Sequence, residues 1–268
     1  MNYSISAQAQ LLRGFAFDFL TCHDLTKVER IMEPDYRLSI GSHVFEGRDS
    51  VYLPATAAQL DQFPGLCVTV HDVMLGPNAV AMRFTEHGAS RKHNGRSAAW
   101  GGVTMFSIKN GRLQHGWAEE DYFARKRQLA TGTCDPVKMP HHAPWDGAVE
   151  PPDKAAAGIA RGWLQDPRAF AAAENIEEIC SGSPSFSQLV EVDEFHVEEL
   201  LSAGERVAFR AVGHGSYAGG FADIDRSRVG RRIALSVAGM LTARSGRVTG
   251  VQVAFDRLGL HRVLLDNA

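Results

Sequence analysis

A strand-like stretch near the middle of the chain places several reactive side chains on one face. With the two-residue period of a strand, this face carries Leu113, His115, Trp117, Glu119 and Asp121. An ordinary core strand would carry Val, Leu or Ile there, whereas an aromatic ring beside an imidazole and two carboxylates is typical of a small-molecule pocket. Burial and a second nearby carboxylate both raise the pKa of a carboxyl group, which then exchanges protons closer to neutral pH.

Each of these side chains also has a structural interpretation, which the sequence leaves open. Asp121 is suited to cap the helical segment that follows it, Trp117 to a place in the core, and His115 to the surface of a strand. The capping interpretation gains weight from Asp256, which ends an equivalent downstream stretch that has lost the titratable face.

The chain contains an internal repeat. Gly111 and Gly246 lie in two turns, Asp121 and Asp256 at two strand ends, and both pairs are separated by the same 135 positions. The second copy lacks a piece that corresponds to Tyr36–Phe45, which we expect to form the lip of the pocket in the first copy. We therefore expect the second copy to be mainly structural.

The order of helical and strand-like patterns predicts an α+β fold. In the first copy we expect helices at 9–20, 25–32 and 50–62, then strands at 66–75, 80–87, 98–108 and 113–119. In the second we expect helices from 154 and from 166, the latter including Ile176, then strands at 190–201, 206–213, 232–241 and 248–255. The predicted domains span 1–130 and 154–268, joined by a Pro-rich linker at 131–153.

Composition and charge restrict the class of protein. The 268 residues are 44% hydrophobic and 22% charged with a formal net charge of −3, which argues against nucleic-acid binding. No secretory signal or membrane-spanning run is apparent, so we expect a cytoplasmic protein without a membrane partner. The four cysteines are scattered, and His141-His142 has no third ligand nearby, so no metal site is expected.

Several motifs of the first copy form a familiar series. They are a G-[KR]-[IVL] turn at Gly111-Arg112-Leu113, a W-x3-D strand end from Trp117 to Asp121, and a closing Gln128-Leu129. Upstream lie Phe45-Glu46-Gly47-Arg48-Asp49 and Phe63-Pro64-Gly65-Leu66. This series resembles the SnoaL-like polyketide cyclases of the nuclear transport factor 2-like superfamily. The resemblance covers residues 9–130 well and 154–261 weakly.

The resemblance implies two fused cone-shaped domains, each a curved antiparallel sheet wrapped around N-terminal helices. Family members usually form homodimers, so the two copies are expected to pair within the chain as a pseudo-dimer, and a further homodimer stays open. In the family the aspartate that resembles Asp121 is the general acid/base of an intramolecular aldol closure, which needs no metal or organic cofactor. The expected partner is a small apolar carbonyl compound.

The predicted site follows from the strand face together with the resemblance. We expect Asp121, His115 and Glu119 to be catalytic, with His115 donating to a developing oxyanion. The expected substrate-binding residues are aromatic: Trp117, Phe106, Phe84, Tyr36 and Trp100. Two alternatives remain. One is epoxide hydrolysis; the other is a binding or assembly module without turnover, which a pocket plugged by Trp100, Phe106 and Trp117 would favour.

Overall fold

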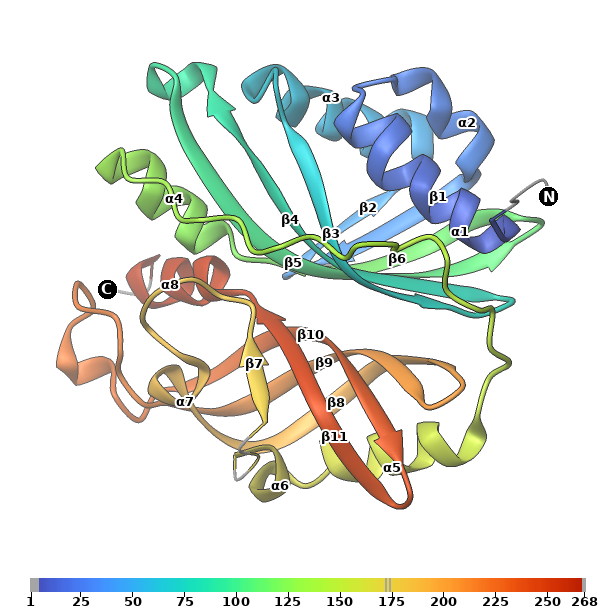
Figure 1. Ribbon diagram of the computed structural model, residues 1–268. Coiled ribbons are helices and arrows are strands. Elements are labelled where there is room, and N and C mark those ends of the chain that lie inside the picture. Colours follow the sequence, from blue (N-terminus) through green and yellow to red (C-terminus); the bar gives the residue numbers. More distant parts are fainter. Residues whose placement is uncertain (1–4, 172, 174, 267–268) are drawn as a thin grey trace.

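The computed structural model describes residues 5–171, 173 and 175–266. Within these residues the strands form two sheets, one of six strands and one of five (Figure 1). The first sheet has the order β2-β1-β6-β5-β4-β3, with β1 Met32–Ile40, β2 His43–Glu46, β3 Cys67–Leu75, β4 Ala79–Ser90, β5 Arg96–Lys109 and β6 Arg112–Glu120. The second has the order β7-β11-β10-β9-β8, with β7 Ile176–Glu178, β8 Val190–Ala203, β9 Arg206–Tyr217, β10 Arg232–Arg244 and β11 Arg247–Phe255.

The two sheets share one topology. Each consists of a four-stranded antiparallel meander, and a further strand lies parallel to its last strand: β1 beside β6, and β7 beside β11. The described part of the second sheet contains no counterpart of β2, and β7 has only three residues. β7 pairs with β11 as residues 38–40 of β1 pair with β6, so the second copy retains part of the stretch predicted to be missing, and what it lacks is a counterpart of β2. The prediction that a helix includes Ile176 is wrong, because Ile176 is the first residue of β7.

Helices cover the concave face of the first sheet and close it into a cone. They are α1 Ala7–Arg13, the π-helical stretch Gly14–Thr21, α2 Val28–Ile31, a second π-helical stretch Arg48–Tyr52, and α3 Leu53–Gln62. Apolar side chains at helical spacing, among them Leu12, Phe15 and Phe19, pack with Phe106 of β5 in one core. Ser6 begins α1 by accepting a hydrogen bond from the amide of Ala9 at 3.1 Å.

The second domain has its own helices and core. The helices are α5 Lys154–Leu164, α6 Pro167–Ala171, α7 Phe186–Leu189 and α8 Arg257–Asp266. Aromatic rings occupy the concave side of this sheet: the centroid of Phe170 lies 4.8 Å from that of Phe195 and 5.1 Å from that of Phe186. Bulky side chains thus fill the space between this sheet and its helices.

The convex faces of the two sheets pack against each other, as Figure 1 shows. Met74, Met105 and Trp117 from the first sheet meet small side chains and Met240 from the second. The fold is therefore α+β, with two fused cone-like domains that pair within one chain. After β6, α4 (Tyr122–Thr131) lies close to α8 of the second domain.

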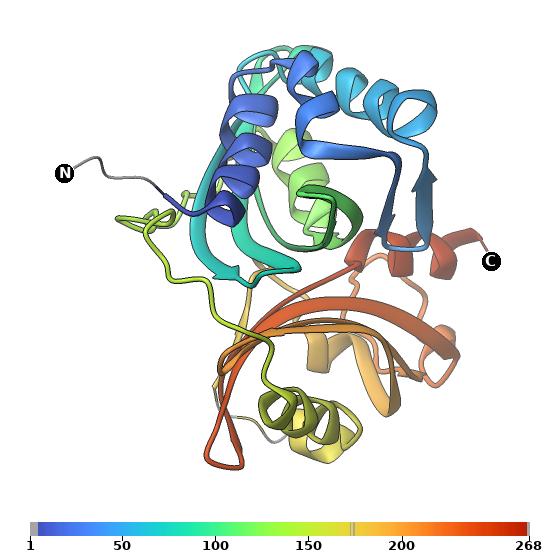
Figure 2. The same ribbon diagram turned by 90° about the vertical axis from the view of Figure 1, so that its right-hand side faces the viewer.

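The segment between the domains is extended and runs along the edge of the first sheet (Figure 2). His141 and Glu150 donate backbone hydrogen bonds, each of 2.9 Å, to the carbonyls of Val70 and Leu75 in β3. The linker thus pairs with part of an edge strand that would otherwise expose its hydrogen-bonding groups.

Candidate functional site

Both faces of β6 are buried, and they serve different parts of the molecule. Gly116, Ala118 and Glu120 face the interior of the first cone, whereas His115 and Trp117 face the second sheet. The register of β5 and β6 shifts between Ser107 and Ile108, and this bulge turns Leu113 into the cone core. The predicted face from Leu113 to Asp121 is therefore not one continuous face.

The first cone encloses a cavity of about 430 Å³, here called the cone pocket. This volume falls within the range typical of small-molecule sites. Its apolar walls come from α-helical, π-helical and strand positions, and its polar groups include three glutamates and three tyrosines. The lining includes Phe15, Leu38, Phe45, Phe84, Phe106, Tyr36, Tyr52, Tyr122, Glu86, Glu119 and Glu120.

Two carboxyl groups face the cone pocket from the strands on either side of β5, Glu86 from β4 and Glu120 from β6. Burial raises the pKa of Glu86 well above its usual range, and the charge of Glu120 raises it further. Burial also raises the pKa of Glu120, against the opposing effect of Arg125. Gln59 Nε2 donates to Glu86 at 2.7 Å, and the indole N–H of Trp100 donates to Glu120 at 3.0 Å. The two groups titrate as a pair, so one favours its proton when the other is ionised.

The sequence interpretation missed both glutamates. A signal for Glu86 was present, because Glu86 lies two residues from Phe84 on the same strand and therefore shares its face. For Glu120 the signal was ambiguous, because alternation does not say which buried face of β6 belongs to the pocket.

A tyrosine hydroxyl in the same pocket has no partner within the described part of the chain. Tyr36 is fully buried, and no described residue supplies a hydrogen-bond partner for its hydroxyl oxygen. Burial raises its pKa, so the group remains a protonated donor. Gly116 makes room for it, since a Cβ there would lie 2.5 Å from the tyrosine hydroxyl and 3.0 Å from Phe106. Buried hydroxyls in proteins usually have a partner, so this one is suited to bind a ligand oxygen.

A second glycine makes room for a glutamate. Gly102 of β5 lies between Phe84 and Glu120 in register, and a Cβ there would lie 2.8 Å from the Phe84 ring and 2.9 Å from Glu120 Cγ. The absence of a side chain at this position allows Glu120 to lie along the pocket floor.

The second domain contributes to the mouth of the cone pocket. Leu258, Arg262, Val263 and Asp266 of α8 line it together with the β1–β2 turn. In Figure 2, α8 (red) lies below the β1–β2 hairpin (dark blue). The second copy is therefore more than a support for the first, because it completes a wall of the pocket.

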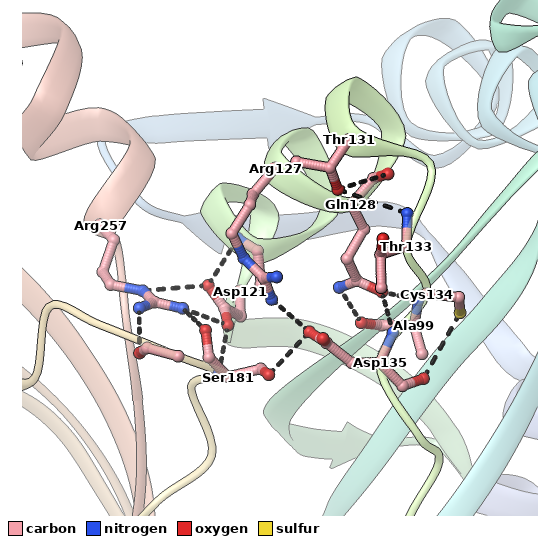
Figure 3. A network of polar contacts seen from close by, with 12 residues as sticks. Ala99, Asp121, Arg127, Gln128, Thr131, Thr133, Cys134, Asp135, Ser181 and Arg257 are labelled. Carbon is pink, nitrogen blue, oxygen red and sulfur yellow. Dashed lines mark hydrogen bonds and ion pairs between the residues drawn. The ribbon is translucent and has the colours of Figure 1, made fainter.

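Asp121 lies outside the cone pocket and fulfils the capping role. Its Oδ1 accepts a hydrogen bond from the amide of Ala124 at 3.1 Å and begins α4. Both oxygens also bind Arg257 of the second domain, and Oδ2 accepts from the amide of Ser181 at 2.8 Å (Figure 3). A carboxylate with all of these partners has no free oxygen directed at a substrate, so its geometry favours a structural role.

Of the other predicted catalytic residues, His115 is separated from the carboxyl pair, whereas Glu119 lines the cone pocket with it. His115 stacks on Trp117 and lies with it on a cavity between the two sheets. Glu119 is buried beside the cone pocket, accepts from the amide of Gly41 at 3.1 Å, and lies 3.4 Å from Arg210 of the second domain. The structure brings Glu119 and His115 to the domain interface.

The predicted substrate-binding residues divide in the same way. Phe84, Phe106 and Tyr36 line the cone pocket, and Trp117 lines the interdomain cavity. Trp100 packs against Phe63 with ring centroids 5.1 Å apart and supports Glu120 through its indole N–H. The aromatic side chains leave the pocket open, so the plugged arrangement is not the one observed.

The described part of the chain contains neither a candidate metal cluster nor a helix that could span a membrane. Residues 5–171, 173 and 175–266 contain no group of three or more His, Cys, Asp or Glu that could hold a metal ion. The helices in the same residues include none long and apolar enough to span a membrane.

Comparison with solved structures returns small proteins that each match about half of this chain. IdmH of Streptomyces antibioticus, assigned as a polyketide cyclase, is 18% identical over 46% of this chain and 98% of its own, with a TM-score of 0.41. TsrD of Streptomyces laurentii is 21% identical over 48% and 98%, with a TM-score of 0.43. An LEH-like epoxide hydrolase of M. tuberculosis is 15% identical over 48% and 92%, with a TM-score of 0.41.

Comparison of the sequence itself gives one further result for the first domain. No curated protein matches the chain. Residues 14–115, which include most of the cone-pocket walls, match the family model described as a SnoaL-like domain.

Proposed function

We propose that the chain is a cofactor-independent acid/base enzyme that acts on a small, largely apolar carbonyl compound in the cone pocket. Glu86 and Glu120 would exchange the protons, and Tyr36 would bind the carbonyl oxygen. The observation that carries this proposal is that one apolar cavity is surrounded by two buried carboxyl groups and by a buried hydroxyl for which the described residues supply no partner. The SnoaL-like match supports the fold of this domain, and the chemistry is argued from the site.

The carboxyl pair is suited to an aldol closure or an isomerisation. In a singly protonated pair, the ionised glutamate takes a proton from the carbon next to the carbonyl group, which leaves an enolate. The enolate carbon bonds to a second carbonyl carbon, and the resulting alkoxide takes the proton of the other glutamate. Protons balance, and the two groups exchange roles. Raised pKa values suit this chemistry because both transfers then occur closer to neutral pH.

The hydroxyl of Tyr36 would stabilise the enolate oxygen. A donor that is already in place and shielded from water stabilises a developing negative charge without reorganisation. The aromatic walls formed by Phe84 and Phe106 would hold a flat substrate beside it.

Proton exchange at carbon tests this proposal without knowledge of the natural substrate. Aromatic ketones such as 2-tetralone are incubated with the protein in D2O, and loss of the α-proton signal is followed by NMR. We expect the wild-type chain to accelerate exchange and Glu86→Gln and Glu120→Gln each to lose at least about 100-fold, the usual range for general acid/base catalysis. Glu46→Gln, at an exposed position of β2, is the matched control and should retain the wild-type rate of α-proton exchange.

The outcome also separates the competing functions. Full exchange in the Glu86→Gln, Glu120→Gln double variant would refute the assigned roles. Saturable ketone binding with no exchange would favour a binding module on the same fold. Conversion of an apolar epoxide to a diol, with loss in the same glutamate variants, would favour hydrolysis by the same carboxyl pair.

A further inference from the structure

A second cavity lies between the two sheets, where their convex faces diverge. It has a volume of about 910 Å³ and is lined by β1, β2 and β6 of the first domain and by β8, β9, β10 and α8 of the second. The turn Gly41–His43 separates it from the cone pocket and lines both. This interdomain cavity therefore exists only because the two copies are joined and paired.

One wall of the interdomain cavity presents a stacked pair of rings. The centroids of His115 and Trp117 lie 3.7 Å apart, with 24° between the ring planes. Burial lowers the pKa of His115 to about 4, with smaller contributions from Arg37 and Arg210, so the imidazole is uncharged at neutral pH. The pair thus forms a flat, uncharged surface suited to contact an aromatic ring.

A buried guanidinium faces the same cavity with a free donor. Arg210 is only 3% exposed. Its Nη2 donates to the carbonyl of Gly41 at 2.5 Å, and its Nε lies 3.0 Å from Glu198 Oε2. Among the described residues none forms a hydrogen bond with Nη1 or, despite the short distance to Glu198, with Nε. Because buried donors are almost always paired, the vacant N–H at Nη1 is a place for a ligand oxygen.

Charges of both signs surround this guanidinium. Glu198 lies 3.0 Å and Glu119 lies 3.4 Å from the guanidinium of Arg210, and burial raises the pKa of Glu119 well above its usual range. Arg37 and Arg232 line the same cavity, where Arg37 is paired with Glu46 and Arg232 with Asp193. Asp256 also lines it and adds a carboxylate, whose Oδ1 caps α8 by accepting a 2.8 Å hydrogen bond from the amide of Gly259.

We propose that the interdomain cavity binds a small aromatic carboxylate, whose carboxylate accepts a hydrogen bond from Nη1 of Arg210 and whose ring lies against His115 and Trp117. The guanidinium group matches carboxylate geometry better than an ammonium group does. The ring pair supplies the apolar contact that a free inorganic anion would not use. This second ligand site is independent of the reaction proposed for the cone pocket.

Isothermal titration with two probes of equal shape tests the proposal. The probes are 2-naphthoate and its neutral analogue 2-naphthamide, both titrated at pH 7.5. We expect 2-naphthoate to bind one-to-one and at least tenfold more tightly than the amide. Arg210→Gln should abolish this preference for the acid, because it removes the charged donor.

A pair of surface variants tests the place of binding without altering buried groups. Ala234 is exposed and lines the interdomain cavity, whereas Ala55 is exposed and lines the mouth of the cone pocket. We expect Ala234→Glu to weaken 2-naphthoate binding at least tenfold relative to Ala234→Gln, since it adds a negative charge beside the anion. Ala55→Glu should leave the affinity unchanged.

Three results would overturn the proposal. They are the absence of saturable 2-naphthoate binding up to its solubility limit, a loss of affinity in Ala55→Glu and not in Ala234→Glu, or an undiminished preference for the acid in Arg210→Gln. The Ala234 pair keeps the test decisive if Arg210→Gln does not fold.

Discussion

Asp121 of the first domain and Arg257 of the second form an ion pair in which both side chains are fully buried. Nη2 lies 2.5 Å from Oδ2 and Nε lies 3.1 Å from Oδ1. The remaining guanidinium donors bind the carbonyls of Ser181 and Gly182, each at 2.9 Å, as Figure 3 shows in part. One carboxylate thus begins α4, neutralises a buried cation and joins the two copies.

Loss of the Asp121 charge should destabilise the protein strongly. Asp121→Asn retains the shape of the side chain and leaves Arg257 as a buried cation without a counter-ion. Breaking such a pair costs about 3–5 kcal/mol in the free energy of unfolding. Denaturant unfolding followed by circular dichroism measures the change.

An exposed pair provides the control for this variant. Asp61 and Arg91 are separated by 2.6 Å, but their side chains are 71% and 61% exposed. Asp61→Asn should cost less than about 1 kcal/mol, as surface pairs do. An equal loss of unfolding free energy in the two variants would show that the buried pair does not stabilise the domain interface.

The internal repeat and the alternation of side chains along β6 show what sequence patterns do and do not determine. The shared aspartates were predictable, and the structure gives the reason: Asp121 and Asp256 each cap the helix that follows a last strand. The assignment of His115 and Trp117 to the cone interior was not reliable, because both faces of β6 are buried, one by helices and one by the second sheet. Alternation reveals that two faces exist, and only tertiary packing decides which one forms the pocket.

The partners of the site residues were beyond the reach of sequence alone. Arg257 and Arg210 bind residues more than 80 positions away in the other copy. Nothing local to Asp121 or Glu119 indicates these contacts. The fold could be predicted because its helices and strands are periodic, whereas the domain interface depends on how two such units pack.

Glu119→Gln should alter the pH dependence of stability. The folded-state pKa of Glu119 is raised by burial, so between its unfolded value of about 4.3 and its folded value the folded chain holds more protons than the unfolded chain. The stability is thus greatest at low pH within this window and falls as pH rises through the folded pKa. One such group contributes a decline of up to about 1.4 kcal/mol per pH unit, which Glu119→Gln should remove.

Unfolding free energies measured between pH 4.5 and pH 8.5 check this expectation. Glu46→Gln is the control, since the Glu46 side chain is 70% exposed and remains hydrated when the chain folds. If Glu119→Gln and the wild-type chain show parallel profiles, burial of this carboxyl group does not govern the decline.

Gly102→Ala should damage both the packing and the shape of the cone pocket. A methyl group there would lie 2.8 Å from the Phe84 ring, and the carbonyl of Glu119, which is backbone, would lie 2.9 Å away and could not move freely. Overpacking of this kind costs about 1–3 kcal/mol in unfolding free energy. Gly65→Ala is the matched control, because no heavy atom lies within 4 Å of its added Cβ. Similar thermal unfolding of the two variants would contradict the assigned role of Gly102.

Tyr36→Phe should separate stability from activity. The hydroxyl of Tyr36 is buried without a partner among the described residues, so its removal relieves a desolvation cost of about 1–3 kcal/mol and should leave the protein as stable or more so. If the hydroxyl binds the substrate oxygen, the same variant should slow α-proton exchange of a bound ketone at least tenfold. Thermal unfolding and exchange in D2O, measured on one preparation, test both parts. Destabilisation together with unchanged exchange would mean that the hydroxyl holds the fold and has no part in catalysis.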